Sequence, residues 1–133
     1  MFRLVKNIDN STTFPEVIRM EASRLAYSYT LGGTAILKNG NLETPAPSDF
    51  PDLVFAASSD RFHRSNIADA FYVTEGMVFK VEYIGTSSPR VGLTVGLAKF
   101  LNGMDAVSYN SSGKGLIIAI DENPQYVYVK FHR

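Results

Sequence analysis

The alternation of apolar and other side chains in the last segment, Gln125–Arg133, most constrains the fold of this chain. Two sets of residues take alternate positions there, with Val127, Val129 and Phe131 on one side and Tyr126, Tyr128 and Lys130 on the other. This two-residue period predicts a β-strand, because successive side chains of a strand point to opposite faces. A strand at a chain end frays unless a neighbouring strand holds it. We therefore expect a compact β-structure with this segment inside a sheet.

The same period recurs through most of the sequence, most clearly at 16–22, 77–83 and 91–98, and the unbroken apolar run at 53–57 is short enough to be a buried strand. It predicts about nine to ten short strands. The expected fold is all-β, a compact antiparallel β-barrel or sandwich (β-tulip-like) with an extended N-terminal arm and at most one short helix. The polar segment Ser58–Asp69 is expected to be an exposed loop or to hold one helical turn after Ser65. A helix over Leu97–Leu101 is the less favoured alternative to a strand.

Glycine and proline positions predict how these strands are connected. Asn39-Gly40 predicts a tight hairpin, because both central residues of a type I′ turn need positive φ. Glu75-Gly76 predicts a second hairpin, between 71–74 and 77–83. The three prolines of segment 45–51 lack the amide hydrogen that a sheet requires, so this segment should be irregular. Small residues alternate with apolar ones in 91–98, so another backbone could approach closely there. The last three expected strands, at 104–109, 116–120 and 126–131, should form a meander.

Length and charge limit the organisation and the partners. A chain of 133 residues suits one domain, which we expect at 15–133 behind an N-terminal arm at 1–14. The 13 basic and 13 acidic residues balance, which argues against a nucleic-acid or an anionic membrane partner. No segment approaches the roughly 20 apolar residues needed to span a bilayer. The absence of cysteine excludes disulfides and thiolate chemistry and fits a reducing compartment.

No residue pattern predicts catalysis, a metal or a cofactor, so we expect a non-enzymatic protein. His63 is interpreted as a surface histidine rather than a base oriented by Asp60 or Asp69, and His132 as a solvated residue. The acid pairs Asp49/Asp52 and Asp121/Glu122 fall in predicted turns, where carboxylates usually bind local backbone amides. Lys114 and its flanking glycines lack the remainder of a phosphate-binding loop.

Paired tyrosines are the remaining signal. Tyr126 and Tyr128 share one strand face with Lys130, and Tyr27 pairs with Tyr29 in the same way. Such a face could bind sugar rings, single-stranded bases or another protein, or it could be covered by a second sheet. Bases are the least favoured ligand, because the sequence shows no basic groove beside the rings.

The order of these features resembles that of tailed-bacteriophage head decoration (capsid cement) proteins. The resemblance covers most of the chain and rests on a pattern of segments rather than on one sharp motif. After the polar arm, the segments that carry it are Pro15–Arg19, Leu31–Leu37, Asn39–Leu42, Val91–Leu97, Gly115–Ile120 and Val129–Phe131. The longer polar loop at Ser58–Asp69 and the smaller number of small residues depart from the usual pattern.

The resemblance implies a structural protein of the virion, assembled in the host cytoplasm, that binds the outer capsid surface and stabilises the head. Its partner would be the major capsid protein, and it would often be a trimer. The arm would add a strand to a neighbouring subunit. The residues implied in this contact are Phe2, Leu4, Val5, Asn7 and Ile8, with Asn7–Thr13 as the hinge.

Further contacts are expected from the polar loop, through Arg61, Phe62 and Arg64.

Two alternatives to a decoration protein stay open. One is a carbohydrate-binding β-sandwich that uses Tyr126, Tyr128 and Tyr109 as stacking platforms. The other is a phage tail or baseplate component, which would share most features of a decoration protein.

Overall fold

The computed structural model describes residues 1–7, 14–21, 30–57, 67–101 and 103–133. Over these residues the chain is all-β, as predicted, and contains no helix. The described ranges contain eleven strands, one or two more than expected. They are β1 (Arg3–Lys6), β2 (Ile18–Glu21), β3 (Thr34–Lys38), β4 (Asn41–Glu43), β5 (Leu53–Phe55), β6 (Ile67–Tyr72), β7 (Val78–Glu82), β8 (Thr94–Ala98), β9 (Ala106–Tyr109), β10 (Gly115–Ile120) and β11 (Tyr126–Phe131).

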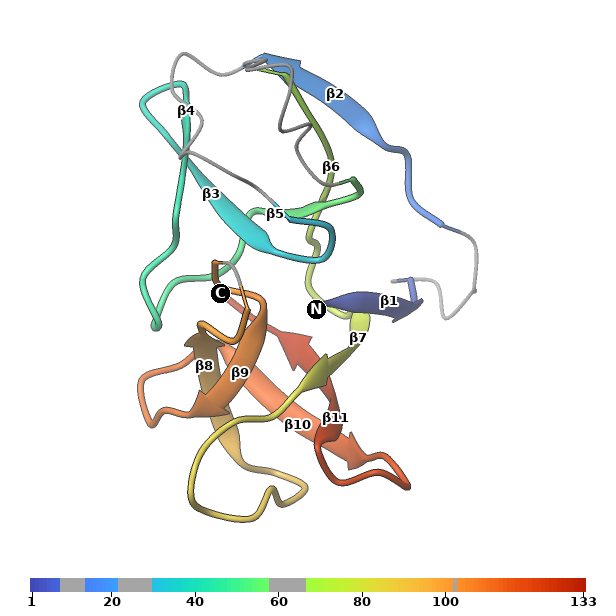
Figure 1. Ribbon diagram of the computed structural model, residues 1–133, viewed down its shortest axis with the longest axis vertical. Coiled ribbons are helices and arrows are strands. Elements are labelled where there is room, and N and C mark those ends of the chain that lie inside the picture. Colours follow the sequence, from blue (N-terminus) through green and yellow to red (C-terminus); the bar gives the residue numbers. More distant parts are fainter. Residues whose placement is uncertain (8–13, 22–29, 58–66, 102) are drawn as a thin grey trace.

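The strands form two antiparallel sheets that lie one above the other along the long axis (Figure 1). The five-stranded sheet has the order β2-β6-β5-β3-β4, and the six-stranded sheet has the order β1-β7-β11-β10-β8-β9. The chain passes from the first sheet to the second between β6 and β7. Strand β1 belongs to the six-stranded sheet although the next strands in sequence do not.

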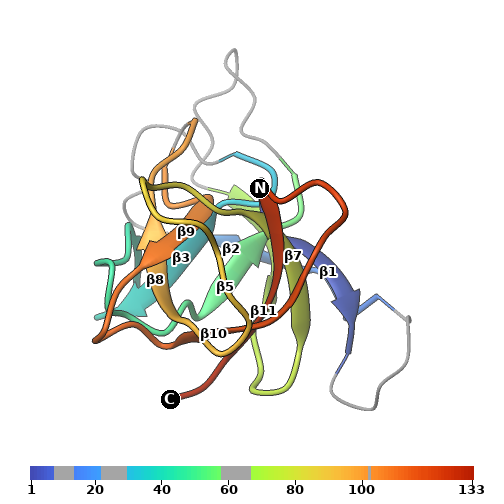
Figure 2. The same cartoon turned by 90° about the horizontal axis from the view of Figure 1, so that it is seen from below.

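The six-stranded sheet curls into a half-barrel (Figure 2). Its edge strand β9 returns to the end of β7, where Tyr83 and Val107 form a parallel bridge. The Ile84 amide donates to the Val107 carbonyl at 2.9 Å. Because of this bridge, the loop between β7 and β8 lies beside the end of β9, which positions the candidate site described below.

The main core fills the space between the two sheets. The alternation that predicted β7 and β11 is confirmed, because Phe79, Val81, Val127 and Val129 are fully buried. Phe71 of the five-stranded sheet stacks on Phe79 of the six-stranded sheet, with ring centroids 6.3 Å apart. A smaller apolar cluster lies on the other face of the five-stranded sheet and contains Ala35, Leu42, Leu53, Phe55, Ala68 and Ala70.

Two of the local predictions are confirmed in detail. Asn39 and Gly40 have φ values of 51° and 78°, and Lys38 pairs with Asn41, as the predicted tight hairpin requires. In β8, the Leu97 amide donates to the Pro47 carbonyl at 2.9 Å. A Cβ atom at Gly96 would lie 2.4 Å from the same oxygen, so glycine is needed for this close approach.

Three predictions about connections are wrong. The strands on either side of Glu75-Gly76 do not form a hairpin, because β6 and β7 belong to different sheets. The last three strands are not a simple meander, because β10 pairs with β8 as well as with β11. Strand β6 begins at Ile67, so the end of the predicted polar loop is part of a sheet. Burial of apolar side chains in the core stabilises these pairings between distant segments, and local sequence patterns do not specify them.

The extended N-terminal arm is also wrong for residues 1–6. Strand β1 pairs with β7 of its own chain, with Leu4 opposite Phe79. Phe2 is only 3% exposed. The centroid of its ring lies 5.9 Å from that of Phe79 and 5.7 Å from that of Phe131. The Phe2 amide donates to the Gly32 carbonyl at 2.8 Å. Burial of this apolar side chain outweighs the freedom that a separate arm would keep.

Candidate binding site

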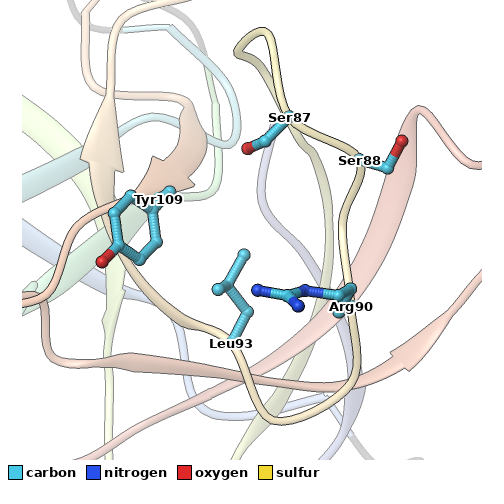
Figure 3. Close-up of a pocket in the computed structure, with 5 residues that line it drawn as sticks. All are labelled: Ser87, Ser88, Arg90, Leu93 and Tyr109. Carbon is cyan, nitrogen blue, oxygen red and sulfur yellow. The ribbon is translucent and has the colours of Figure 1, made fainter.

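A cavity of about 420 Å³ opens between the β7–β8 loop and the end of β9 (Figure 3). Its lining residues are Ser87, Ser88, Arg90, Leu93 and Tyr109. The Arg90 guanidinium group extends toward Leu93, and the Tyr109 ring lies on the opposite side of the same space. The volume falls in the range of about 300–1,000 Å³ that is typical of small-ligand pockets.

Backbone hydrogen bonds fix the loop that carries most of these residues. The Gly92 amide donates to the Ile117 carbonyl at 2.8 Å, and the Ile117 amide donates to the Leu93 carbonyl at 3.0 Å. Ser87 is held by a hydrogen bond of 3.0 Å between its hydroxyl group and that of Tyr83, whose side chain is buried. These hydrogen bonds attach the end of the loop to β10 and hold Ser87 against Tyr83.

The lining combines one cation, one aromatic ring and two hydroxyl groups. Tyr109 is 58% exposed although it lies opposite Val95 in the β8–β9 pair. No carboxylate lines the cavity, and Arg90 forms no ion pair with any described residue. An exposed ring beside a guanidinium group can bind a ligand that has both an apolar face and a negative charge.

The tyrosine face predicted on β11 has a different environment. Tyr126 and Tyr128 are half-buried, on the side of the sheet away from the main core. The Lys80 ammonium group lies 5.1 Å from the centre of the Tyr126 ring. With Met1, Arg3 and Lys80, Tyr126 lines a second cavity of about 170 Å³, which is smaller than typical ligand pockets.

Tyr128 belongs to a polar network that alters two pKa values. Its hydroxyl group donates to Asp121 at 2.9 Å, and Lys80 lies 3.6 Å from the same carboxylate. The hydrogen bond from Tyr128 is the main reason why the pKa of Asp121 is below its ordinary value, and the Asn123 amide and Lys80 act in the same direction. The same hydrogen bond raises the pKa of Tyr128, because it stabilises the protonated hydroxyl group.

Replacement of Tyr128 with phenylalanine is expected to raise the pKa of Asp121 toward 3.8, its ordinary value. Because the folded-state pKa is lowered, the ionised carboxylate stabilises the fold above pH 3.8, and this contribution is lost as the pH falls through the lowered pKa. The stability difference between the Tyr128→Phe variant and the wild type should therefore shrink in acid. NMR titration of the carboxyl carbon measures the pKa, and Tyr126→Phe is the control that should leave it unchanged.

The acidic residues considered for catalysis bind structural partners. Asp49 accepts from the Ala46 amide at 2.7 Å, and Asp52 accepts from the Leu37 amide at 2.8 Å. Asp105, which the sequence did not single out, is buried and its carboxylate accepts from the Phe100 amide at 2.8 Å. These contacts agree with the interpretation of Asp49 as a turn residue. His132 is exposed, as expected.

Several predicted residues lie outside the described part of the chain. They are His63, Asp60, Tyr27, Tyr29, Ile8 and the loop contacts Arg61, Phe62 and Arg64. Within the described ranges, no group of three or more potential ligands could hold a metal ion. Those ranges also contain no helix of the length and hydropathy needed to cross a bilayer.

Of the residues predicted to anchor a capsid contact, the two large apolar ones that the structure describes pack into the chain's own core. Phe2 is buried, and Leu4 packs against the same core. Val5 and Asn7 are half-buried. Sequence reasoning named Tyr109 only as a third stacking residue and treated Gly85–Arg90 only as a turn. Arg90 is the one charged residue of the turn Gly85–Arg90, and this could have suggested a binding loop. The proximity of Arg90 to Tyr109, however, depends on the bridge between Tyr83 and Val107.

Comparisons of the chain with protein-family models, with curated proteins and with solved structures found no significant match.

Proposed function

We propose that this chain is a non-enzymatic structural protein that binds the outer surface of a bacteriophage head and stabilises it. Its partner would be the major capsid protein, its location the virion, and its oligomeric state a trimer. The segment pattern described above supports this proposal, together with a small all-β body and a balanced charge. Since Phe2 and Leu4 pack into their own core, a surface other than the first residues must make the contact.

The observation that carries the proposal is the position of β2 as the terminal strand of the five-stranded sheet. Strand β2 is at the outer border of this sheet (Figure 1), and among the described residues only β6 pairs with it. Just before it, Phe14 is 56% exposed and Val17 is 43% exposed. Phe14 is held against the body by a contact between its ring and that of Phe71, at 5.2 Å.

An edge strand presents backbone groups that can pair with a strand from another chain. Strand addition of this kind supplies affinity through backbone hydrogen bonds and specificity through neighbouring side chains. The exposed side chains of Phe14 and Val17 would supply apolar contacts with the capsid protein. The ion pair between Arg19 and Asp69, at 3.1 Å, joins β2 to its neighbour β6 within the same chain.

Replacement of Val17 with lysine is expected to weaken binding to the head by about tenfold or more, because the lysine adds a charge to an apolar contact. The measurement is cosedimentation of the purified protein with empty heads of the virus whose genome encodes it. Leu116→Lys is the matched control, because Leu116 is an exposed apolar residue of β10 in the other sheet.

If Val17→Lys and Leu116→Lys weaken binding equally, or if neither weakens it, the β2 edge is excluded as the contact. Light scattering of the wild type tests the trimer, which a monomer at all concentrations would contradict. Electron microscopy of decorated particles separates a head protein from a tail or baseplate component, since the two occupy different parts of the particle.

Carbohydrate binding is the second candidate function, and the exposed Tyr109 ring at the cavity is the observation that favours it. Tyr126 and Tyr128 are half-buried, so we propose Tyr109 as the stacking residue instead. Tyr109 lines the cavity between the β7–β8 loop and the end of β9. A protein on the outside of a particle could carry both activities, because the cleft and the β2 edge lie in different sheets.

A further inference from the structure

We propose that the Arg90–Tyr109 cleft, lined by Ser87, Ser88, Arg90, Leu93 and Tyr109, binds one ring of an acidic saccharide, a uronate. The proposal rests on the second candidate function, carbohydrate binding, and specifies its ligand class. The first candidate function, binding to a phage head, does not require it.

The charge of the cleft selects an acidic ligand. Arg90 is exposed and has no carboxylate partner among the described residues, and none of the lining residues is acidic. A guanidinium group can donate two parallel hydrogen bonds to one carboxylate, which gives both affinity and orientation. One cation in the cleft matches one carboxylate per sugar ring.

The apolar surface of the cleft selects a ring. Tyr109 and Leu93 are separated from each other by the open space of the cavity (Figure 3). A pyranose has faces of C–H groups and a rim of hydroxyl groups, so it can pack on an aromatic ring while its rim forms hydrogen bonds. The hydroxyl group of Ser87 lies at the border of the same space and can contact that rim.

Hydrogen bonds within the protein hold the backbone of the loop and the Ser87 hydroxyl group in place. Hydrogen bonds from Gly92 and Ile117 hold the base of the loop, and the Ser87–Tyr83 hydrogen bond holds its tip. A preformed site loses less conformational entropy on binding than a loop that must first be ordered. Nucleic acid is a poorer match, because it requires a row of cations along its backbone and the cleft has only one lining cation.

Binding of a galacturonic acid tetramer and of a galactose tetramer should be compared by titration calorimetry. The two ligands have the same ring and differ at C6, where the first has a carboxylate and the second an alcohol. We expect the acidic tetramer to bind about tenfold more tightly, since hydrogen bonds between charged groups contribute more than neutral ones.

Two substitutions separate the charge from the ring. Arg90→Gln should weaken binding of the acidic tetramer about tenfold and leave the neutral one nearly unchanged. Tyr109→Ala should weaken both ligands, and Tyr109→Phe should restore binding because it keeps the stacking surface. Arg3→Gln is the control for Arg90, because Arg3 lines the smaller cavity in a different part of the sheet. Thermal unfolding checks that each variant remains folded.

The outcomes distinguish the two levels of the proposal. Equal affinity for both tetramers, unaffected by Arg90→Gln, would leave a carbohydrate-binding site but refute the uronate. Binding of neither tetramer to the wild type would refute both. Loss of acidic-tetramer binding in Arg3→Gln, with normal binding in Arg90→Gln, would place the site in the smaller cavity and contradict the assignment.

Discussion

Replacement of Phe2 with alanine is expected to lower the free energy of unfolding by about 3 kcal/mol, near the lower end of values for buried phenylalanine. The reason is that the side chain is buried among Phe79 and Phe131, so its removal leaves a cavity in the main core. Denaturant unfolding followed by circular dichroism measures the change as a shift of the midpoint at a constant slope.

Phe14→Ala is the matched control, because Phe14 is another phenylalanine near the start of the chain but is more than half exposed. Its effect should be smaller, about 1 kcal/mol or less. If Phe2→Ala leaves the midpoint unchanged, the first strand does not belong to the cooperative core. The hypothesis of an N-terminal arm that binds a neighbouring subunit would then be favoured again.

Replacement of Gly113 with alanine is also expected to destabilise the fold strongly, by about 3 kcal/mol, at the upper end of typical overpacking costs. A Cβ atom at this position would lie 2.0 Å from the Val95 carbonyl oxygen and 2.6 Å from the Gly96 nitrogen. Both are backbone atoms of β8, so no side-chain rotation can relieve the clash. Thermal unfolding of the variant should show a large decrease in Tm.

Ser112→Ala is the control for this substitution. Ser112 is exposed in the same turn, and its contact with the Asn110 side chain uses its backbone amide, which the substitution keeps. It should change Tm little. Wild-type stability of Gly113→Ala would mean that β8 does not approach this turn as closely as the structure shows.

The sequence predicted the strands better than their partners. The two-residue period identified β7, β8 and β11, because the apolar residues of one face of each strand are buried in the main core. The turn at Asn39-Gly40 was predictable because its backbone angles favour few residues. Both signals are local, so they survive without knowledge of the rest of the chain.

The assignment of strands to sheets was not predictable in the same way. A turn at Glu75-Gly76 is compatible with a hairpin and with a crossing between sheets, and only packing of Phe71 on Phe79 distinguishes them. The polar segment after Lys6 was read as a hinge because polar composition at a chain end is typical of loose segments. It gave no sign that Phe2 and Leu4 are complementary to the inner surface of β7.

The candidate site was predictable only in part. Tyr109 was recognised as a ring that could stack, and Arg90 was placed in a turn, but nothing in the sequence brings these two residues to one cavity. Their proximity follows from the Tyr83–Val107 bridge, which closes the half-barrel. A site formed by a loop and the end of a strand that a sheet brings together cannot be found from the spacing of residues alone.

Strand β7 has neighbours from opposite parts of the sequence, because β1 covers one of its edges and β11 the other. Such pairings bring together residues far apart in sequence, and proteins dominated by them typically fold in milliseconds to seconds. During translation, the half-barrel cannot form until residues 126–131 have emerged from the ribosome. Until then the edge of β7 that pairs with β11 is open, and the apolar residues that β11 covers would make the nascent polypeptide prone to aggregation.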